Sequence, residues 1–288
     1  MKPSQLQSYA ERIDRVVARL ETADPERVPT VPELADIAAL SEYHFQRIFR
    51  LMTGESVGEA VRRVRLARSV PEIAAALPIT QAAGASGYAS SQGYARALRQ
   101  QAGVSASAAR ADAAKLIELA SKLRQAPNSS GTAPLALEVV SLVPFRLLAI
   151  RNVGDYAELN SSYERLFDLV MAQVPEDALR GIYGLPHDDP QSVPAEQCRF
   201  DCALAVEAGG RAEGALCELT LGGGEFIRLH CHGDYDRIHD RIDDVYVETI
   251  VTLDRAVGKG PLFIHYLDDP EEVAEPDLRA DVFLPLER

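Results

Sequence analysis

The feature that most constrains this chain is an internal repeat at an offset of 49 residues. Five residues of the first copy recur in the second: Ser41, Arg47, Arg50, Gly54 and Ser56 become Ser90, Arg96, Arg99, Gly103 and Ser105. In the first copy, Phe45, Ile48 and Phe49 recur at the spacing of one helix face, which predicts a buried side. A short helix that occurs twice indicates a duplicated supersecondary unit rather than an isolated amphipathic helix.

The first copy carries a second stripe on the opposite side of its helix. Tyr43, Gln46, Arg47 and Arg50 offer a hydroxyl, an amide and two guanidinium groups, which suit base edges and phosphates. Thr30 caps a preceding short helix, and Ser41 stands where the next helix needs an N-cap. We therefore predict two helix-turn-helix pairs, each with a recognition helix; the alternative is a solvated helix face in a bundle. The predicted DNA-binding residues are Ser41, Tyr43, Gln46, Arg47, Arg50, Ser91, Gln92 and Arg96.

We expect the second recognition helix to recognise DNA less strongly than the first. Gly93 lies inside the second helix, and a helix-interior glycine costs about 1 kcal/mol. We therefore expect mutations in the first helix to impair promoter recognition more than those in the second. The Arg-rich helix between the pairs ends or kinks at Pro71; its arginines either help on the DNA backbone or form a solvated face. These arginines are Arg62, Arg63, Arg65 and Arg68.

Charge divides the 288-residue chain in two. The net charge is −13, but residues 41–110 hold 9 Lys+Arg against 4 Asp+Glu, whereas residues 111–288 hold 16 against 32. This asymmetry predicts a basic module joined to an acidic one, with separate partners. The absence of a long apolar run and the small number of cysteines, four, favour a cytoplasmic protein that does not enter a membrane.

The acidic half contains a second repeat, at an offset of 79. Gly154-Asp155-Tyr156 and Gly233-Asp234-Tyr235 mark the same strand-to-helix corner. The pattern predicts an α+β domain of duplicated β-α-β-β units around a concave cleft. The predicted boundaries are an all-α double helix-turn-helix domain at 1–110, a helix and a Pro/Gly/Ser-rich flexible linker at 111–136, and the α+β domain at 137–288.

At the first recognition helix the residues resemble the DNA-binding domain of AraC/XylS-type transcriptional regulators. The family pattern SxWHLQRxF is filled by Ser41, Tyr43, His44, Phe45, Gln46, Arg47 and Phe49, with Tyr in place of Trp. A second family signature is matched by Gly87, Tyr88, Ser90, Ser91, Gln92 and Arg96. Departures from the family occur in the second pair, at Ala82, Gly84 and Gly93.

Residues 137–287 resemble the GyrI-like (gyrase-inhibitor-like) effector-binding domain. The resemblance rests on Gly154-x-Tyr156, the run from Gly181 to Pro190, Cys198-Arg199-x-Asp201, His232-Gly233-x-Tyr235 and the run from Tyr266 to Pro270. It implies a cleft for a small amphipathic or aromatic ligand, with Tyr183, Glu225, Phe226, Ile264 and Tyr266 as candidate lining residues; each could equally be core. The family commonly has a Glu where this chain has Ile264, which counts against acid–base catalysis.

Other motifs are weaker. His230, Cys231 and His232 alternate along a strand, so we expect no metal site, and the sequence predicts no cofactor. Gly222-Gly223-Gly224 is read as a hairpin turn rather than a phosphate cradle. The main hypothesis is a transcriptional regulator whose binding to double-stranded promoter DNA is modulated by a small molecule. The alternatives are a small-molecule hydrolase or sequestering binder, and an adaptor that contacts RNA polymerase or gyrase.

Overall fold

A computed structural model describes residues 4–24, 27–75, 77–103, 105, 108 and 135–287. Of the predicted helix and linker at 111–136, residues 111–134 lie outside the described residues. The described residues form two compact units. The first contains residues 4–8, 40–48 and 135–287, and the second contains residues 9–39 and 49–108. The first half of the predicted recognition helix therefore belongs to the same unit as the α+β domain.

The N-terminal part of the chain is helical throughout, as predicted. Its helices are α1 (Gln5–Thr22), α2 (Val31–Ala38), α3 (Glu42–Thr53), α4 (Val57–Arg68), α5 (Val70–Ala74), α6 (Ile79–Ala85) and α7 (Ser91–Ala102). Thr30 caps α2 through a capping box with Glu33, and Ser56 caps α4 in the same way with Glu59. The tight turn between α2 and α3 contains Ala39 with φ of 53°. The two predicted helix-turn-helix pairs are α2–α3 and α6–α7.

Two expectations for these helices need correction. Helix α3 begins after Ser41, but the Ser41 Oγ is buried and forms no hydrogen bond within the described part of the chain, so it does not cap the helix. Arg63 is neither a DNA-facing group nor part of a solvated face. Its side chain is 5% exposed, and its Nη2 lies 2.6 Å from Oε1 of Glu55, whose side chain is 4% exposed.

The core of the second unit surrounds the second helix-turn-helix pair. Leu66, Ile73, Ala82, Tyr94 and Leu98 are buried together. The Tyr94 hydroxyl donates to Oγ of Ser69, 2.8 Å away, at the end of α4. Pro71 starts the separate helix α5 rather than kinking α4, because its fixed φ suits a first turn.

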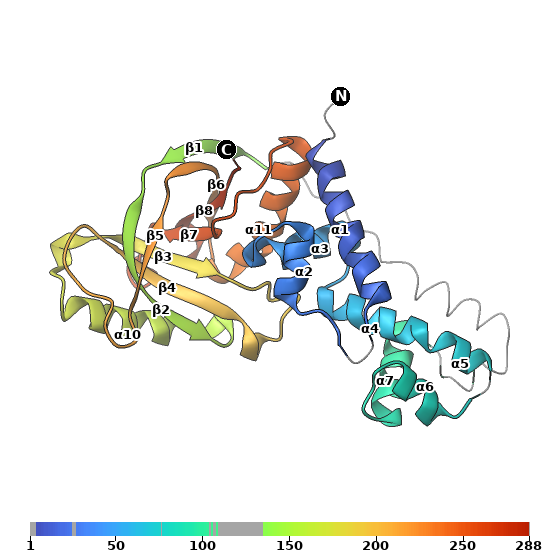
Figure 1. The fold of residues 1–288 in the computed structure, drawn as a ribbon. Helices are drawn as coiled ribbons and strands as arrows, with labels where there is room; N and C mark the ends of the chain where they lie inside the picture. Colours follow the sequence, from blue (N-terminus) through green and yellow to red (C-terminus); the bar gives the residue numbers. More distant parts are fainter. Residues whose placement is uncertain are drawn as a thin grey trace. The chain divides into compact units, whose positions relative to one another are not determined.

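The first unit is built on one antiparallel sheet of eight strands (Figure 1). The strands are β1 (Leu137–Leu142), β2 (Phe145–Val153), β3 (Leu179–Pro186), β4 (Arg199–Val206), β5 (Cys217–Leu221), β6 (Gly224–His232), β7 (Phe263–Tyr266) and β8 (Arg279–Pro285). Their order is β1-β6-β8-β7-β3-β4-β2-β5. Helix α10 (Asn160–Met171) follows β2, and helix α11 (Ile238–Val247) follows β6.

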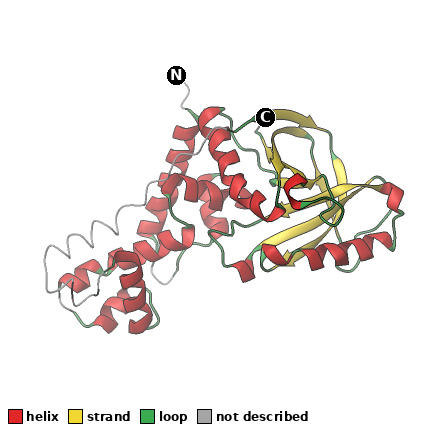
Figure 2. Ribbon diagram, turned by 180° about the vertical axis from the view of Figure 1, so that it is seen from behind, coloured by secondary structure: helices red, strands yellow, loops and turns green. Residues whose placement is uncertain are grey.

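This strand order shows the duplication. The two copies are β1 to β4 and β5 to β8. When each strand is replaced by its counterpart in the other copy (β1 by β5, β2 by β6, β3 by β7 and β4 by β8, and the reverse), the strand order is reversed, as two copies related by a two-fold axis require. The axis passes between β3 and β7, where Gly184 lies opposite Ile264. The α+β domain of duplicated β-α-β-β units is therefore confirmed, and Figure 2 shows its strands in yellow.

Two expectations for the strands need correction. The pattern from Glu138 to Arg151 predicts a single strand, but Val143 and Pro144 separate β1 from β2. Gly222 and Gly223 do not form a hairpin turn, because β5 pairs with β2 whereas β6 pairs with β1 and β8. Both glycines have φ near +80°, and a Cβ on Gly222 would lie 2.3 Å from the Val143 carbonyl oxygen.

Helices α10 and α11 cover the same face of the sheet. Tyr163 of α10 contacts Tyr266 of β7, and His239 of α11 contacts Phe200 of β4. We call the other side, which α10 and α11 do not cover, the open face. It carries an aromatic cluster that includes Phe145, Tyr183, Phe226, Phe263 and Phe283.

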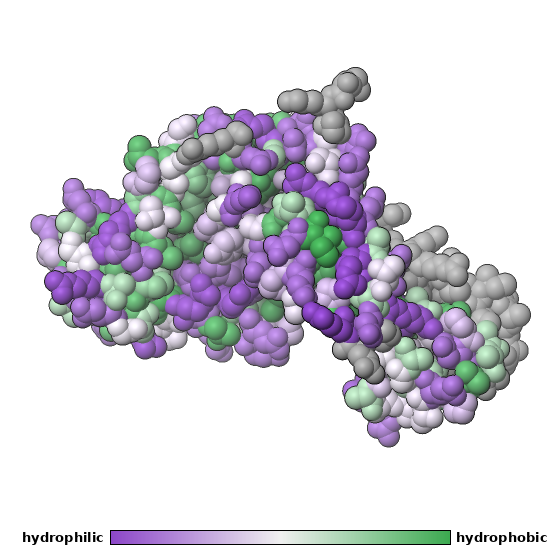
Figure 3. Space-filling model, viewed as in Figure 1, coloured by the Kyte–Doolittle hydropathy of each residue, from purple (hydrophilic) through white to green (hydrophobic). Residues whose placement is uncertain are grey.

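Hydrophilic and hydrophobic residues are mixed on the surface of the described part of the chain (Figure 3). Figure 3 shows a mainly hydrophilic face with hydrophobic residues in small patches. Exposed large apolar residues are scattered, as at Val143, Val153 and Val251. Among the described residues, no helix is long and apolar enough to cross a membrane.

Candidate nucleic-acid interface

The polar face of α3 is buried at its centre. Gln46 is 8% exposed and Arg47 is 4% exposed, whereas Tyr43 is 37% exposed. Burial of an arginine is unfavourable unless its charge is paired and its donors are satisfied. The neighbours of Gln46 and Arg47 therefore determine what this face can do.

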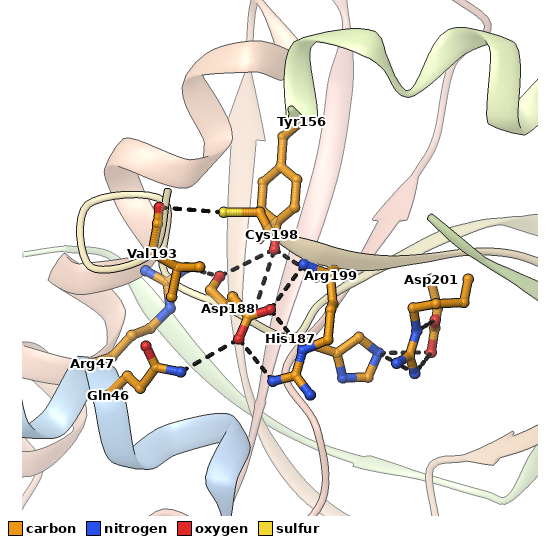
Figure 4. Close-up of polar contacts among 10 residues, drawn as sticks. Gln46, Arg47, Tyr156, His187, Asp188, Val193, Cys198, Arg199 and Asp201 are labelled. Carbon is orange, nitrogen blue, oxygen red and sulfur yellow. Dashed lines mark hydrogen bonds and ion pairs between the residues drawn. The ribbon is translucent and has the colours of Figure 1, made fainter. Parts of the chain in front are cut away.

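Three aspartates and a backbone carbonyl surround these two side chains. Figure 4 shows Gln46 and Arg47 beside one of these aspartates, Asp188. Gln46 donates from Nε2 to Oδ1 of Asp188, 3.4 Å away. Arg47 places Nη1 3.1 Å from Oδ1 of Asp243 and 3.7 Å from Oδ1 of Asp189, and its Nη2 donates to the Asp188 carbonyl oxygen, 3.4 Å away. Asp188 and Asp189 lie in the connection between β3 and β4, and Asp243 lies on α11.

Asp188 is held in place by its own domain. Its Oδ2 accepts hydrogen bonds from the backbone N–H and Nε of Arg199, each 2.8 Å away, and its Oδ1 accepts from Nη2 of the same residue. The Tyr156 hydroxyl donates to the Arg199 carbonyl oxygen, 2.7 Å away, and lies 3.2 Å from that of Asp188. Burial alone would raise the pKa of Asp188, but the hydrogen bonds from Arg199 outweigh it and hold this pKa below its ordinary value. The carboxylate facing Gln46 is therefore charged and fixed.

His44 is a second anchor of α3. Its Nε2 lies 2.7 Å from the Gly260 carbonyl oxygen, and its Nδ1 lies 2.5 Å from the Tyr246 hydroxyl on α11. A carbonyl only accepts, so Nε2 carries the proton and Nδ1 accepts from Tyr246. Burial, together with the nearby Arg47 charge, lowers the pKa of His44 to about 4, although its hydrogen bond to Gly260 opposes the shift. The site therefore holds His44 as a neutral imidazole.

Tyr43 links α3 to the open face of the sheet. Its ring centroid lies 5.1 Å from that of His187. Nε2 of His187 lies 2.7 Å from Oδ2 of Asp201, which also pairs with Arg151. Burial opposes ionisation of Asp201, but the hydrogen bonds from His187 and Arg151 lower its pKa below the ordinary value.

The duplication provides an internal comparison for the Asp188 site. In the second copy, the carboxylate of Asp268 accepts the same three hydrogen bonds from Arg279, and the Tyr235 hydroxyl contacts both backbone carbonyls. Figure 4 shows the first copy, where Gln46 and Arg47 reach Asp188. The Asp–Arg–Tyr arrangement is thus a repeated structural motif, and one copy also engages α3.

The second recognition helix presents its predicted side chains differently. Ser90 caps α7 by accepting from the Gly93 N–H, 3.1 Å away. Gln92 and Arg96 are exposed, and Ser91 is half-buried. Arg50 of α3 is also half-buried. In this structure Gln92 and Arg96 of α7, the helix expected to recognise DNA less strongly, face solvent.

The five predicted ligand residues do not share one face, because side chains alternate along a strand. Tyr183 and Phe226 lie in the aromatic cluster of the open face, and Tyr183 stacks on His265 with centroids 4.4 Å apart. Ile264 and Tyr266 lie on the face covered by the helices. Glu225 is exposed and pairs with Arg255, 2.8 Å away.

Polar groups border the aromatic cluster on the open face. Asp281 is 5% exposed, and its Oδ1 lies 2.5 Å from Nδ1 of His230. His265 lies opposite Asp281 in the strand register. Among the described residues, no group of three or more His, Cys, Asp or Glu is placed to hold a metal ion.

Comparison with protein families connects this geometry to a known domain type. The family model "GyrI-like small molecule binding domain" matches residues 136–287, more than half of the chain. The chain belongs to the GyrI-like family. A helix-turn-helix domain of the AraC type matches residues 34–112, which include α3, α4 and α7. The chain thus joins a DNA-binding domain to a GyrI-like half.

Solved structures similar to this chain cover about half of it. The EcmrR–DNA complex in EcmrR-RPo, a cryo-EM structure, is 18% identical over 53% of this chain and 57% of that chain, with a TM-score of 0.41. A hydrolase from Listeria innocua is 13% identical over 54% of this chain and 94% of its own, with a TM-score of 0.39. SAV2435 bound to tetraphenylphosphonium is 14% identical over 53% and 94%, with a TM-score of 0.37.

No sequence motif predicts the acidic partners of α3. Asp188 and Asp189 occur within a run typical of the family, and Asp243 belongs to none of the motifs. The one available signal was the opposite charge of the two halves, which was interpreted as a sign of separate partners. In the structure these opposite charges meet at Arg47.

Proposed function

We propose that this protein is a transcriptional regulator that binds a promoter element through α3 and α7 and responds to a small molecule bound by its GyrI-like half. The observation that carries the proposal is the presence of both domains in one chain, at residues 34–112 and 136–287. A regulator of this kind requires a ligand that binds the DNA-competent and DNA-incompetent states with different affinities.

On the DNA side, we assign base contacts to Gln46 and Arg47 and backbone contacts to Arg50. Arginine pairs with guanine O6 and N7, and glutamine pairs with adenine N6 and N7, through two hydrogen bonds each. Ser41 and Tyr43 complete the proposed DNA-contacting surface at α3, which we call its reading face. Ser91, Gln92 and Arg96 form the reading face of α7. Two recognition helices in one chain would read two successive major-groove segments about 34 Å apart.

The test is binding of the full chain to labelled duplexes from its own upstream region, with a scrambled duplex of equal length as the control. We expect tighter binding to the upstream duplex, and an affinity that falls steeply as salt is raised. Equal affinity for both duplexes, or binding that does not depend on salt, would contradict the proposal.

On the ligand side, we assign the effector to the open face, around Tyr183 and Phe226. Aromatic walls bordered by a few polar groups suit an amphipathic or aromatic molecule. The test is a ligand screen that measures the change in DNA affinity of the full chain. Tyr183→Ala and Phe226→Ala should abolish the response, whereas Glu225→Ala, an exposed change on the same strand as Phe226, should preserve it.

We also propose that the GyrI-like half binds its ligand without transforming it. Ile264, where the resemblance implies a Glu, is fully buried and offers no proton donor or acceptor. The alternative is a hydrolase. Steady release of a hydrolysis product from any ligand that shifts DNA affinity, measured with the full chain, would replace our proposal with that alternative.

A further inference from the structure

We propose that α3 has two alternative partners, DNA and the acidic site formed by Asp188, Asp189 and Asp243, and that the two exclude each other. The GyrI-like half would then inhibit the DNA-binding domain by occupying its reading face. This inference rests on the proposed function, because it requires that α3 reads DNA. It adds a mechanism by which the GyrI-like half prevents DNA binding.

The hydrogen-bond donors of Gln46 and Arg47 are already occupied at the acidic site. Nη1 of Arg47 faces Asp243 and Asp189, its Nη2 donates to the Asp188 carbonyl oxygen, and Nε2 of Gln46 donates to the Asp188 carboxylate. Base recognition by these residues uses the same nitrogen atoms. One guanidinium cannot make both sets of contacts at once.

Burial leads to the same conclusion. Gln46 and Arg47 are 8% and 4% exposed, so a DNA groove cannot reach them while the acidic site holds them. The site also imitates the charge of DNA, since it presents carboxylate oxygens and a carbonyl oxygen to a cationic helix face. DNA must displace these acceptors, and its apparent affinity is reduced by the fraction of molecules in the inhibited state.

The second copy of the motif shows that the Asp–Arg pair forms without a contact to Gln46. Asp268 and Arg279 repeat the hydrogen bonds of Asp188 and Arg199. The motif therefore stabilises each half of the domain, and contact with Gln46 is an addition at the first copy. The duplicate supplies a control substitution with the same local chemistry.

The experiment measures the affinity of full-length variants for the upstream duplex at fixed salt. Asp243→Asn removes a charged partner of Arg47, and Asp240→Asn removes the same charge from an exposed position one turn earlier on α11. We expect Asp243→Asn to tighten DNA binding by about tenfold and Asp240→Asn to change it by less than about twofold. Thermal unfolding of each variant verifies that it is folded.

Equal tightening by Asp243→Asn and Asp240→Asn would overturn the inference, because net charge would then explain the effect. A second pair repeats the test at the motif itself: Asp188→Asn should tighten binding, and Asp268→Asn should not. If the wild type and all four variants fail to distinguish the upstream from the scrambled duplex, the proposed function itself fails. If the wild type distinguishes them and neither pair differs, only the inhibition is refuted.

Discussion

The substitution Tyr246→Phe tests the inhibited state without changing any charge. The Tyr246 hydroxyl lies 2.5 Å from Nδ1 of His44, and both side chains are 1% exposed. Phenylalanine keeps the ring and its packing but leaves Nδ1 of His44 without this donor. The substitution should therefore weaken the attachment of α3 to the GyrI-like half while leaving the DNA-reading residues intact.

The size of the effect follows from the cost of an unsatisfied buried acceptor, about 1–3 kcal/mol. This cost falls on the inhibited state alone, because His44 released from the site can bond to water. If most molecules are inhibited, the same free energy appears as a gain in apparent DNA affinity of roughly 5- to 150-fold.

The assay is titration of a fluorescent upstream duplex with wild type, Tyr246→Phe and Tyr235→Phe. Tyr235 is the matched control, because its hydroxyl contacts the Asp268 and Arg279 carbonyl oxygens in the second copy of the motif. Tighter binding by Tyr246→Phe alone is the expected result. Unchanged or weaker binding by a folded Tyr246→Phe protein would refute the reasoning.

Three further predictions follow from the same contacts. Glu55→Gln should lower the free energy of unfolding by about 3 kcal/mol, seen in thermal denaturation, because it replaces the carboxylate that faces the buried guanidinium of Arg63 with a neutral amide. Acidification to about pH 5 should weaken attachment of α3 by about 2 kcal/mol, seen as lower protection factors of the α3 amides after correction for the intrinsic exchange rate at each pH. The pKa of His44 is lowered to about 4, so the contribution of neutral His44 is complete above pH 6.5 and declines toward pH 4. Arg47→Ala should lower the discrimination between the cognate base and other bases at one position by about 1–3 kcal/mol. An equal or larger loss of discrimination from Arg96→Ala, measured on duplexes with single base changes, would contradict the predicted ranking of the two helices.

The helices and the duplicated domain could be predicted because they follow from local patterns. Thr30 and Ser56 each precede a glutamate by three residues, which specifies a helix start. The two repeats fixed the number of helix-turn-helix pairs and the two-fold plan of the sheet. Ser41 shows the limit of this approach, since its residue type suits a cap but its hydroxyl does not form one.

The side-chain environment of the site could not be predicted in the same way. Periodicity identified the polar stripe of α3, but it does not distinguish a solvent-facing stripe from one matched by acidic residues about 140 to 200 positions later. Arg47 and Arg63 have the same residue type on neighbouring helices, yet one contacts Asp243 and the other Glu55. Only tertiary structure assigns such partners.

The most direct test of the account is hydrogen exchange of the full chain with and without the upstream duplex. The connection between β3 and β4, residues 187–198, holds Asp188 and Asp189. If DNA displaces the acidic site, amides of α3 should exchange more slowly in the complex, and those of residues 187–198 should exchange faster because they lose Gln46 and Arg47. Slower or unchanged exchange at residues 187–198, with α3 protected by the duplex, would contradict the claim that DNA and the GyrI-like half compete for this helix.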